Sequence, residues 1–527
     1  MQETNLTLDA SNDRPIESLS DYEIGQDNIQ RFGLDVHNPV FAIAAIIVVS
    51  FVVFTLSFPA QAAAEFGALR PWLTTRFDWV FMGSANVFVL ICLGIIVSPW
   101  GNIRLGGPGA VPDFSRLSWF SMLFAAGMGI GVMFYGVLEP LNHYLAPPFD
   151  AEAAAPAQRR ALAMAGTILH WALHPWAIYA IVGLALAFFS FNKGLPLSIR
   201  AAFYPLLGER VWGWSGHLID VLAVFATLFG LAASLGFGAQ QSSAGLAYLF
   251  GLPDDHLTQL LVIGGITLVA LVSVLRGIDG GVKLLSEVNI AAAAALFLFV
   301  LFSGPTVQIL ERIGLNTVVY LEYLPALSNW VGRDDGYFMH DWTTFYWSWW
   351  IAWSPFVGMF IARVSRGRTV REFLVCSLLI PSFVCIAWMT VFGGSAIDQY
   401  VNVGYGGVAD TIRHWAPELA MFRFLEELPF AGVTSALAIA LVMVFFITSM
   451  DSGSLVIDTI TAGGKLDTPL VQRIFWCAFA GLVAAALMLG GGLGSLQALT
   501  LATGFPFCLV LLLMSFSTLK GLWQTSR

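Results

Sequence analysis

The sequence predicts an all-α integral membrane protein with twelve transmembrane helices. Of its 527 residues, 57% are hydrophobic and only 11% are charged, whereas a soluble domain is about 25% charged. A bilayer core about 30 Å thick needs roughly 20 apolar residues per helix, and stretches of that kind recur along the chain. A transmembrane barrel would show alternating segments of about ten residues instead, and the chain lacks that pattern.

The predicted spans follow one another along nearly the whole chain. They are expected near residues 40–59, 78–99, 117–137, 160–190, 217–249, 258–275, 285–304, 341–363, 371–393, 431–461, 470–491 and 496–518. All five cysteines fall inside these spans and are expected to be small apolar core residues rather than disulfide partners.

Both ends of the chain are expected on the cytoplasmic side of a bacterial inner membrane. Residues 1–39 form a polar, acidic tail without the basic start and short apolar core of a signal peptide, and residues 519–527 form a short C-terminal tail. An even number of spans places both ends on one side. Most of the 25 Lys and Arg residues then lie in cytoplasmic segments, in keeping with the positive-inside bias.

Two amphipathic stretches between spans, residues 306–324 and 409–428, are expected to lie along the outer face. The first belongs to a connecting region of residues 305–340. The sequence shows no nucleotide-binding loop and no soluble catalytic domain. It therefore predicts neither an enzyme nor a nucleic-acid partner, and a transported solute would be driven by an ion gradient or by exchange.

Glycines alternate in the third span, in "AAGMGIGVMFYGVLEP" (125–140), at Gly127, Gly129 and Gly131. A helix-packing motif would space small residues by four, so spacing by two indicates an unwound break whose N–H groups approach a ligand. Ser354-Pro355 suggests a second interruption, in the eighth span. Two interruptions at matching positions of two five-helix halves indicate an inverted-repeat transporter with a site near the bilayer midplane.

Four segments resemble the betaine/choline/carnitine transporter family: "GMGIGVMFYGVLEP", "HWALHPWAIYAIVGLALAF" (170–188), "FYWSWWIAWSPFVGMFIARVSRGRTVREF" (345–373) and "ITSMDSGSLVID" (447–458). The resemblance runs through nearly all spans. It implies the inverted five-helix repeats of sodium-coupled amino-acid transporters, with residues 117–304 and 341–518 as the two halves and residues 40–99 as two additional N-terminal helices. It also implies a homotrimer embedded in membrane lipid.

Aromatic residues gather inside the fourth and eighth spans rather than at span ends, where an interfacial belt would lie. A quaternary ammonium has no N–H donor, but aromatic faces bind its charge. Spacings of four and three place Tyr346, Trp350 and Trp353 on one helical face, with Trp347 pointing elsewhere. By resemblance the substrate cage comprises Trp171, Trp176, Tyr179 and Trp350, with Trp349 and Trp353 lining the path beside it.

Oxygen ligands for a sodium ion are expected where the break in span 3 faces the tenth span. By resemblance the set is Ala125, Met128, Phe445, Thr448 and Ser449. A second family site uses two threonines four apart and a phenylalanine. Here Thr227 and Phe356 are present, but Leu231 occupies the other threonine position, which leaves the second sodium in doubt. No cofactor other than the coupling ion is expected. Asp451, a charged residue inside a span, is expected to have a partner that the sequence does not identify.

The sequence disfavours two other classes of protein, a membrane enzyme and a channel. His170 and His174 are four apart, the spacing of a metal pair, but no third ligand is evident in the sequence, so satisfied or pathway-lining histidines are expected. A channel is disfavoured because a dry aromatic cage binds too snugly for rapid conduction.

The sequence thus predicts a sodium-coupled symporter for glycine betaine or dimethylsulfoniopropionate. Gly131 favours such a zwitterion, because choline-carrying relatives have an aspartate at that position. The alternatives are a proton-coupled choline importer and a sodium-independent carnitine-type exchanger.

Overall fold

The computed structural model describes residues 19–126, 129–276 and 282–526. Within these ranges the regular secondary structure is helical apart from one antiparallel hairpin, β1 (Asn28–Arg31) with β2 (Leu34–His37). The predicted all-α character therefore holds for the part of the chain after residue 39. The hairpin lies in the segment that the sequence marks only as a polar tail.

The α-helices follow in chain order, and the longest of them are α2, α8 and α19. Their bounds are α1 (Val40–Ser57), α2 (Pro59–Val97), α3 (Arg116–Ala126), α4 (Ile130–Leu145), α5 (Pro156–Trp171), α6 (Leu173–Lys193), α7 (Tyr204–Leu207), α8 (Trp214–Phe250), α9 (His256–Arg276), α10 (Val282–Ser303), α11 (Thr306–Ser328), α12 (Thr344–Arg363), α13 (Val370–Met389), α14 (Ser395–Asp398), α15 (Gly407–Arg413), α16 (Ala420–Glu426), α17 (Ala431–Thr461), α18 (Leu470–Leu489) and α19 (Gly492–Thr525).

Short 3₁₀ and π segments join these helices. The 3₁₀ segments are η1 (Pro99–Asn102), η2 (Pro148–Asp150), η3 (Arg200–Phe203), η4 (Gly208–Trp212) and η8 (Pro417–Leu419), and the π segments are η5 (Tyr337–Thr343), η6 (Thr390–Gly394) and η7 (Gln399–Val403).

Nine helical segments of the described residues are long and apolar enough to cross a membrane. A bent pair, Glu287–Ser303 with Thr306–Ser328 at 110°, makes ten if it is counted as one span. The chain is therefore a multi-pass membrane protein, while the twelve spans and the inverted repeat stay predictions. The tryptophan-rich α12 is not among the nine, because indole and phenol rings rank low on hydropathy scales.

The helix break expected in the third span is present. Helix α3 is described as far as Ala126, and α4 begins at Ile130 after an extended Gly129 (φ −168°, ψ −174°). Gly127 and Met128, which were predicted to line the site, lie outside the described residues. The break separates two helices that would otherwise form one span.

The interruption expected at Ser354-Pro355 is wrong, because α12 runs without a break through Pro355. Proline cannot donate to the carbonyl four residues earlier, but the Ser354 hydroxyl donates to that carbonyl, of Ile351, at 2.7 Å. The second break lies in the fourth span, which was predicted as continuous. There Ala172 (φ −101°, ψ −118°) separates α5 from α6.

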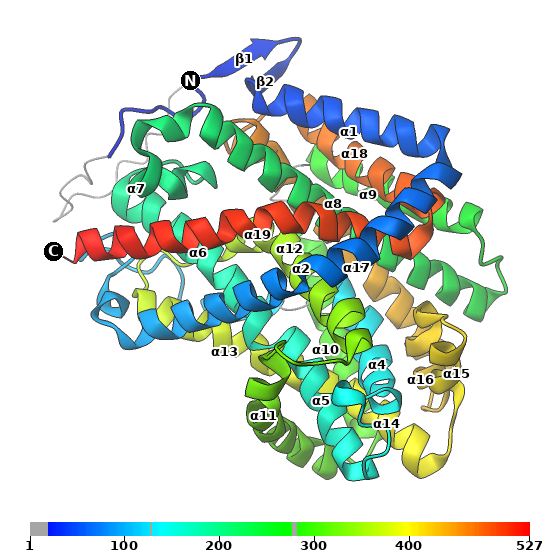
Figure 1. Cartoon of the computed structure of the whole chain (residues 1–527). Helices are drawn as coiled ribbons and strands as arrows, with labels where there is room; N and C mark the ends of the chain where they lie inside the picture. Colours follow the sequence, from blue (N-terminus) through cyan, green and yellow to red (C-terminus); the bar gives the residue numbers. More distant parts are fainter. Residues whose placement is uncertain (1–18, 127–128, 277–281, 527) are drawn as a thin grey trace.

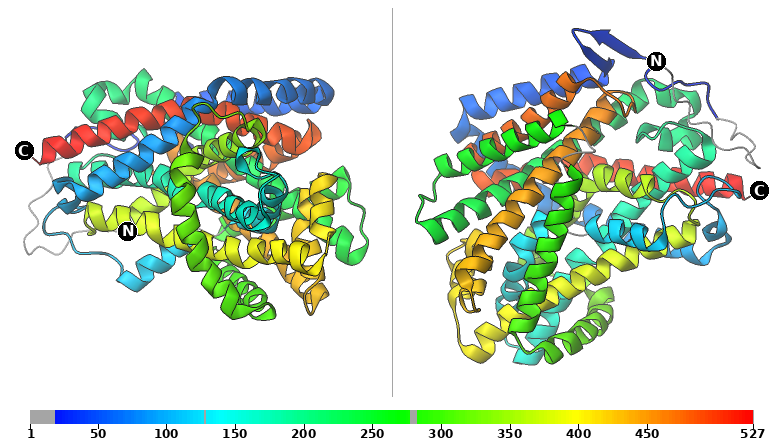
Figure 2. Two further views of the ribbon diagram at one scale, coloured as in Figure 1. Left: turned by 60° about the horizontal axis from the view of Figure 1, so that its bottom comes forward. Right: turned by 180° about the vertical axis from the view of Figure 1, so that it is seen from behind.

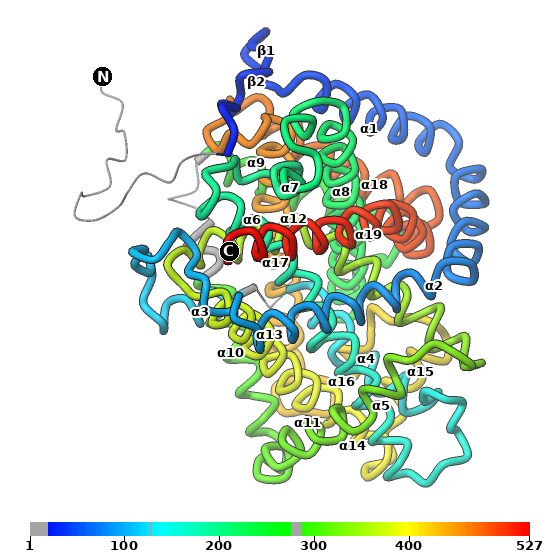
Figure 3. The backbone as a smooth tube through the Cα atoms, turned by 60° about the vertical axis from the view of Figure 1, so that its left-hand side comes forward, coloured from blue at the N-terminus to red at the C-terminus, as the bar shows by residue number. Residues whose placement is uncertain are grey.

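Helix α12 is central to the bundle and packs against α6, α8 and α19. Figure 2 shows α17 (orange) lying diagonally beside α10, and α17 also packs along α8. Helices α5, α11, α14, α15 and α16 gather at the end of the molecule away from the hairpin (Figures 1 and 3). The amphipathic stretch 306–324 is one helix, whereas 409–428 forms α15, η8 and α16.

The hairpin is fixed to the connection between α17 and α18. The Asp35 carboxylate pairs with Lys465 at 2.6 Å, and the Asn28 side chain donates to the carbonyl of Ala462 at 2.9 Å. Burial, followed by the nearby Arg200, lowers the pKa of His37 to about 3. The ring of His37 is therefore neutral at pH 7. Its Nε2 lies 3.3 Å from Arg200 Nη1, while the Arg200 guanidinium forms an ion pair with Asp220 at 2.6 Å.

Candidate substrate-binding site

A cavity of about 270 Å³ lies where the α3–α4 break faces α6, α12 and α17. It brings together most of the residues predicted for the substrate and sodium sites, and the predicted residues that line it are Trp171, Trp176, Tyr179, Trp349, Trp350, Trp353, Gly129, Gly131, Ala125, Phe356, Phe445, Thr448 and Ser449. Thr227 is not among the lining residues.

One side of the cavity is an aromatic wall, formed by the rings of Trp171, Trp176, Tyr179, Trp349, Trp350 and Trp353. Trp349 and Trp350 stack with centroids 5.2 Å apart. Trp171 meets Trp350 edge-on at 5.1 Å, and Tyr179 meets it edge-on at 6.0 Å. The rings present faces and edges in several directions, which suits a bulky cation.

Four of the five indole N–H groups of this wall are held by acceptors of the protein. They donate from Trp171 to Glu139 Oε2 (2.8 Å), from Trp350 to the His170 carbonyl (2.9 Å), from Trp349 to Ser234 Oγ (3.2 Å), and from Trp353 to the Gly230 carbonyl (3.0 Å). Because these donors are occupied, the wall offers a ligand mainly π surface.

Two aromatic residues of α12, Trp347 and Tyr346, do not line the cavity. Trp347 stacks on His174 with centroids 5.1 Å apart. Tyr346 shares a helical face with Trp350, as its spacing predicts, but its hydroxyl donates to Glu139 and it does not line the cavity.

Gly131 allows α4 to approach the aromatic wall closely. A Cβ at this position would lie 2.7 Å from a ring carbon of Trp171 and 3.0 Å from one of Trp349. At Gly129 an added Cβ would have nothing within 4 Å. The glycine at 131 is therefore required by space, whereas the one at 129 is not.

A second group of lining residues, which we call the polar wall, consists of Ala125, Phe445, Thr448, Ser449 and Asn289. The Thr448 hydroxyl donates to its own helix, to the carbonyl of Val444 at 3.0 Å, which leaves its oxygen lone pairs available to a cation. Asn289 is only 3% exposed, and its Oδ1 has no hydrogen-bond partner within the described residues. Sequence reasoning missed Asn289, although a lone asparagine inside the apolar run 285–304 is a usable signal.

Of the doubtful second sodium set, Phe356 lines the cavity and Thr227 does not. Thr227 is buried, and its hydroxyl donates to the Ala223 carbonyl at 2.8 Å. Leu231 fills space against α17, where a Cβ added at Gly453 would lie 2.9 Å from it.

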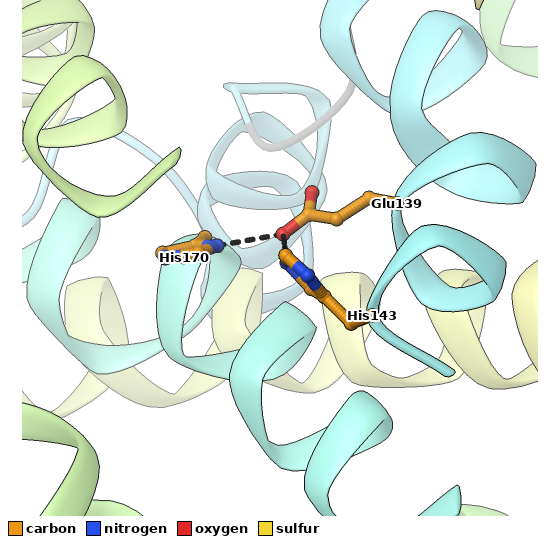
Figure 4. A group of neighbouring side chains, drawn as sticks. All are labelled: Glu139, His143 and His170. Atoms are coloured by element: carbon orange, nitrogen blue, oxygen red, sulfur yellow. Dashed lines mark hydrogen bonds and ion pairs between the residues drawn. The ribbon is translucent and has the colours of Figure 1, made fainter. Parts of the chain in front are cut away.

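Behind the aromatic wall lies a fully buried group of Glu139, His143 and His170 (Figure 4). Glu139 Oε1 lies 2.6 Å from His170 Nδ1 and 3.4 Å from His143 Nε2. The first distance is that of a direct hydrogen bond, with no space for an ion between the two atoms.

The histidine pair weighed from spacing does not form, because His174 turns to Asn86 Oδ1 at 2.9 Å. Glu139 beside His170 was not evident in the sequence, since the two residues are 31 positions apart. Asp451, whose partner the sequence did not identify, accepts from the Ser273 hydroxyl at 2.8 Å.

A multi-pass helical bundle around an aromatic cavity is the architecture expected of a membrane transporter. A family model described as betaine/carnitine/choline family transporter matches residues 39–527. The chain therefore belongs to the betaine/carnitine/choline transporter family and is a transporter rather than an enzyme.

Several relatives are similar over nearly the whole chain. A glycine betaine/proline/choline transporter of Vibrio parahaemolyticus is 54% identical, covering 96% of this chain and 95% of the relative. Glycine betaine transporter 1 of the same organism is 51% identical, covering 96% and 98%. A glycine betaine transporter of Acinetobacter baylyi is 40% identical, covering 92% and 73%.

Proposed function

We propose that the protein is a secondary active symporter that imports glycine betaine or a similar zwitterion, such as dimethylsulfoniopropionate, together with sodium by alternating access. The observation that carries this proposal is the aromatic wall, in which four of the five indole N–H groups already donate to acceptors of the protein. A trimethylammonium or sulfonium head donates no N–H bonds, so it gains most from such a π surface in a dry cavity.

The charge balance of the cavity supports a zwitterion over a cation. None of the described residues that line it is acidic. A net-positive solute such as choline would gain from a carboxylate in the cavity, whereas betaine carries its own. The carboxylate of betaine fits the amide ends of the α3–α4 break, since a helix N-terminus attracts anions. Choline is the second candidate substrate, because it appears in the name of the relative that is 54% identical.

Sodium coupling is supported by the oxygens of the polar wall. Thr448 and Ser449 are half-buried and line the same cavity as the aromatic wall. A sodium ion bound there would lie close to the substrate, which is the arrangement that coupling requires. Coupling to protons and sodium-independent exchange of carnitine are the alternatives that the experiment below distinguishes.

Uptake of radiolabelled solutes into proteoliposomes tests the proposal. Betaine, dimethylsulfoniopropionate, choline, carnitine and proline are each offered with an inward sodium gradient, with a proton gradient, and with neither. We expect betaine or the sulfonium zwitterion to accumulate only with sodium. Choline uptake at micromolar concentrations would favour choline over a zwitterion as the substrate. Exchange of betaine without any gradient would contradict the proposed symport.

Gly131→Asp tests the preference for a zwitterion and needs Gly131→Ala as its control, because any Cβ at 131 meets two rings. The added carboxylate should repel betaine by several kcal/mol at an effective dielectric near 20. We expect Gly131→Asp to shift preference towards choline and Gly131→Ala to weaken both solutes alike. A preference that is the same in the two variants would show that the charge at this position does not select the substrate.

We further propose that the protein is a homotrimer in a bacterial inner membrane, with both termini in the cytoplasm. Single cysteines placed at Ser20 and Ser526, in a background without the five native cysteines, test the orientation. We expect an impermeant thiol reagent to label them in inside-out vesicles and not in intact cells. Cross-linking of the purified protein in lipid nanodiscs tests the trimer.

A further inference from the structure

We propose that Glu139 is a positioning residue for substrate binding: its carboxylate fixes the rings of the aromatic wall and adds negative charge behind them. The inference rests on the proposed function, because it assumes that this wall binds a cationic head. Glu139 does not line the cavity and is 0% exposed. Its effect must therefore pass through the side chains that it contacts.

The Glu139 carboxylate joins three helices at one point. Oε2 accepts from Trp171 Nε1 at 2.8 Å and from the Tyr346 hydroxyl, and Oε1 lies 2.6 Å from His170 Nδ1. Glu139 belongs to α4, Trp171 and His170 to α5, and Tyr346 to α12. With a hydrogen on His170 Nδ1, both oxygens act as acceptors, which is the bonding pattern of an ionised carboxylate.

The positions of two rings of the aromatic wall, Trp171 and Trp350, depend on the Glu139 carboxylate. Trp171 is held directly through its N–H. Trp350 donates to the carbonyl of His170, whose ring Glu139 contacts and whose Nε2 lies 2.9 Å from Thr343 Oγ1. The ring of Tyr346 stacks on the ring of His170 and on that of Trp350, with centroid distances of 4.6 Å and 6.1 Å. Without the Glu139 carboxylate, the rings of Trp171 and Trp350 would no longer be held in their edge-on contact.

Charge adds a second effect. An anionic oxygen at the indole N–H makes the ring of Trp171 more electron-rich, which strengthens its attraction for a cation. The carboxylate also lies only one ring away from the cavity, where little water screens it. A merely structural carboxylate would hold the rings without favouring a charged head over an uncharged one.

The test uses two ligands of the same shape. Glycine betaine and 3,3-dimethylbutyrate differ in having a nitrogen cation or a neutral carbon within the same three methyl groups. Their binding to the purified full-length protein in nanodiscs is measured by titration calorimetry. Glu139→Gln keeps the volume of the side chain, but its NH₂ group would face at least one of the donors from which Glu139 now accepts a hydrogen bond. We expect betaine affinity to fall about tenfold and the ratio of betaine to dimethylbutyrate affinity to fall at least fivefold.

Tyr346→Phe removes one donor and retains the carboxylate, with Tyr320→Phe as a matched buried tyrosine outside the cavity. We expect about a threefold loss of betaine affinity for Tyr346→Phe and none for Tyr320→Phe. This pair also decides the matter if Glu139→Gln does not fold, since equal effects of the two substitutions would overturn the proposal.

The proposal is also overturned if Glu139→Gln binds betaine as wild type does, or if it loses both ligands equally. A wild-type protein that binds no betaine refutes the proposed function instead, and this inference falls with it.

Discussion

The two walls of the central cavity are built in opposite ways. On the aromatic wall, the four indole N–H groups of Trp171, Trp349, Trp350 and Trp353 each donate to an acceptor of the protein. On the polar wall, the Asn289 amide oxygen has no partner within the described residues, and the backbone of Gly129, which also lines the cavity, is extended rather than helical. One wall is fixed before a ligand arrives, and the other has groups free to bind one.

The difference follows from what each wall is proposed to bind. A quaternary ammonium makes no directional hydrogen bonds that could orient the rings around it. Its site is therefore expected to hold the rings in place beforehand, so that binding does not pay the entropy of ordering them. A sodium ion instead takes oxygens, so its ligands must be free of strong competing partners. Substitutions on each wall test this contrast.

Trp350→Leu should abolish uptake, whereas Trp347→Leu should change it little. Trp350 lines the cavity, and Trp347 stacks on His174 away from it. Loss of one ring from a desolvated cage costs about 2 kcal/mol, or some thirtyfold in affinity. Binding titration of both variants measures this. Equal losses would show that the aromatic wall is not the binding surface.

Gly131→Ala should weaken betaine binding, whereas Gly129→Ala should not. A Cβ at 131 meets the rings of Trp171 and Trp349, and a Cβ at 129 meets nothing within 4 Å. Overpacking costs about 1–3 kcal/mol, so we expect a loss of about twentyfold. Calorimetry on the two alanine variants checks this, and a larger effect at 129 would mean that the polar side is the constrained one.

Replacing Thr448 and Ser449 together by alanine should raise the sodium concentration needed for half-maximal uptake by about tenfold, because two oxygen ligands are lost. The matched control is the double replacement of Ser515 and Thr518 in α19, two buried hydroxyls that donate to their own helix outside the cavity. Sodium-dependent uptake in proteoliposomes measures both. An unchanged sodium requirement in the first variant would place coupling elsewhere or favour protons.

Ser234→Ala should have the smallest effect. Its hydroxyl accepts from Trp349 at 3.2 Å and from Trp353 at 3.1 Å, but Trp353 also donates to the Gly230 carbonyl. A single hydrogen bond contributes about 0.5–1.5 kcal/mol, so affinity for betaine should fall about threefold to fivefold. A variant with full wild-type affinity would show that anchoring of the indole donors is not needed to hold the aromatic wall.

Much of this protein can be predicted from local sequence. The apolar stretches predict the membrane helices, because a lipid environment demands long runs of apolar residues. The alternating glycines predict the break before α4, since backbone freedom is a property of the residues themselves. The tryptophans inside spans predict an aromatic surface, and the motifs that contain them led to the family.

The tertiary structure decided what depends on neighbours. Glu139 meets His170 across two helices, and Asp451 meets Ser273 178 positions away. The hairpin is held by Lys465, 430 positions from Asp35. Such contacts arise only when helices pack, because packing, and not proximity in sequence, determines which buried polar groups become partners.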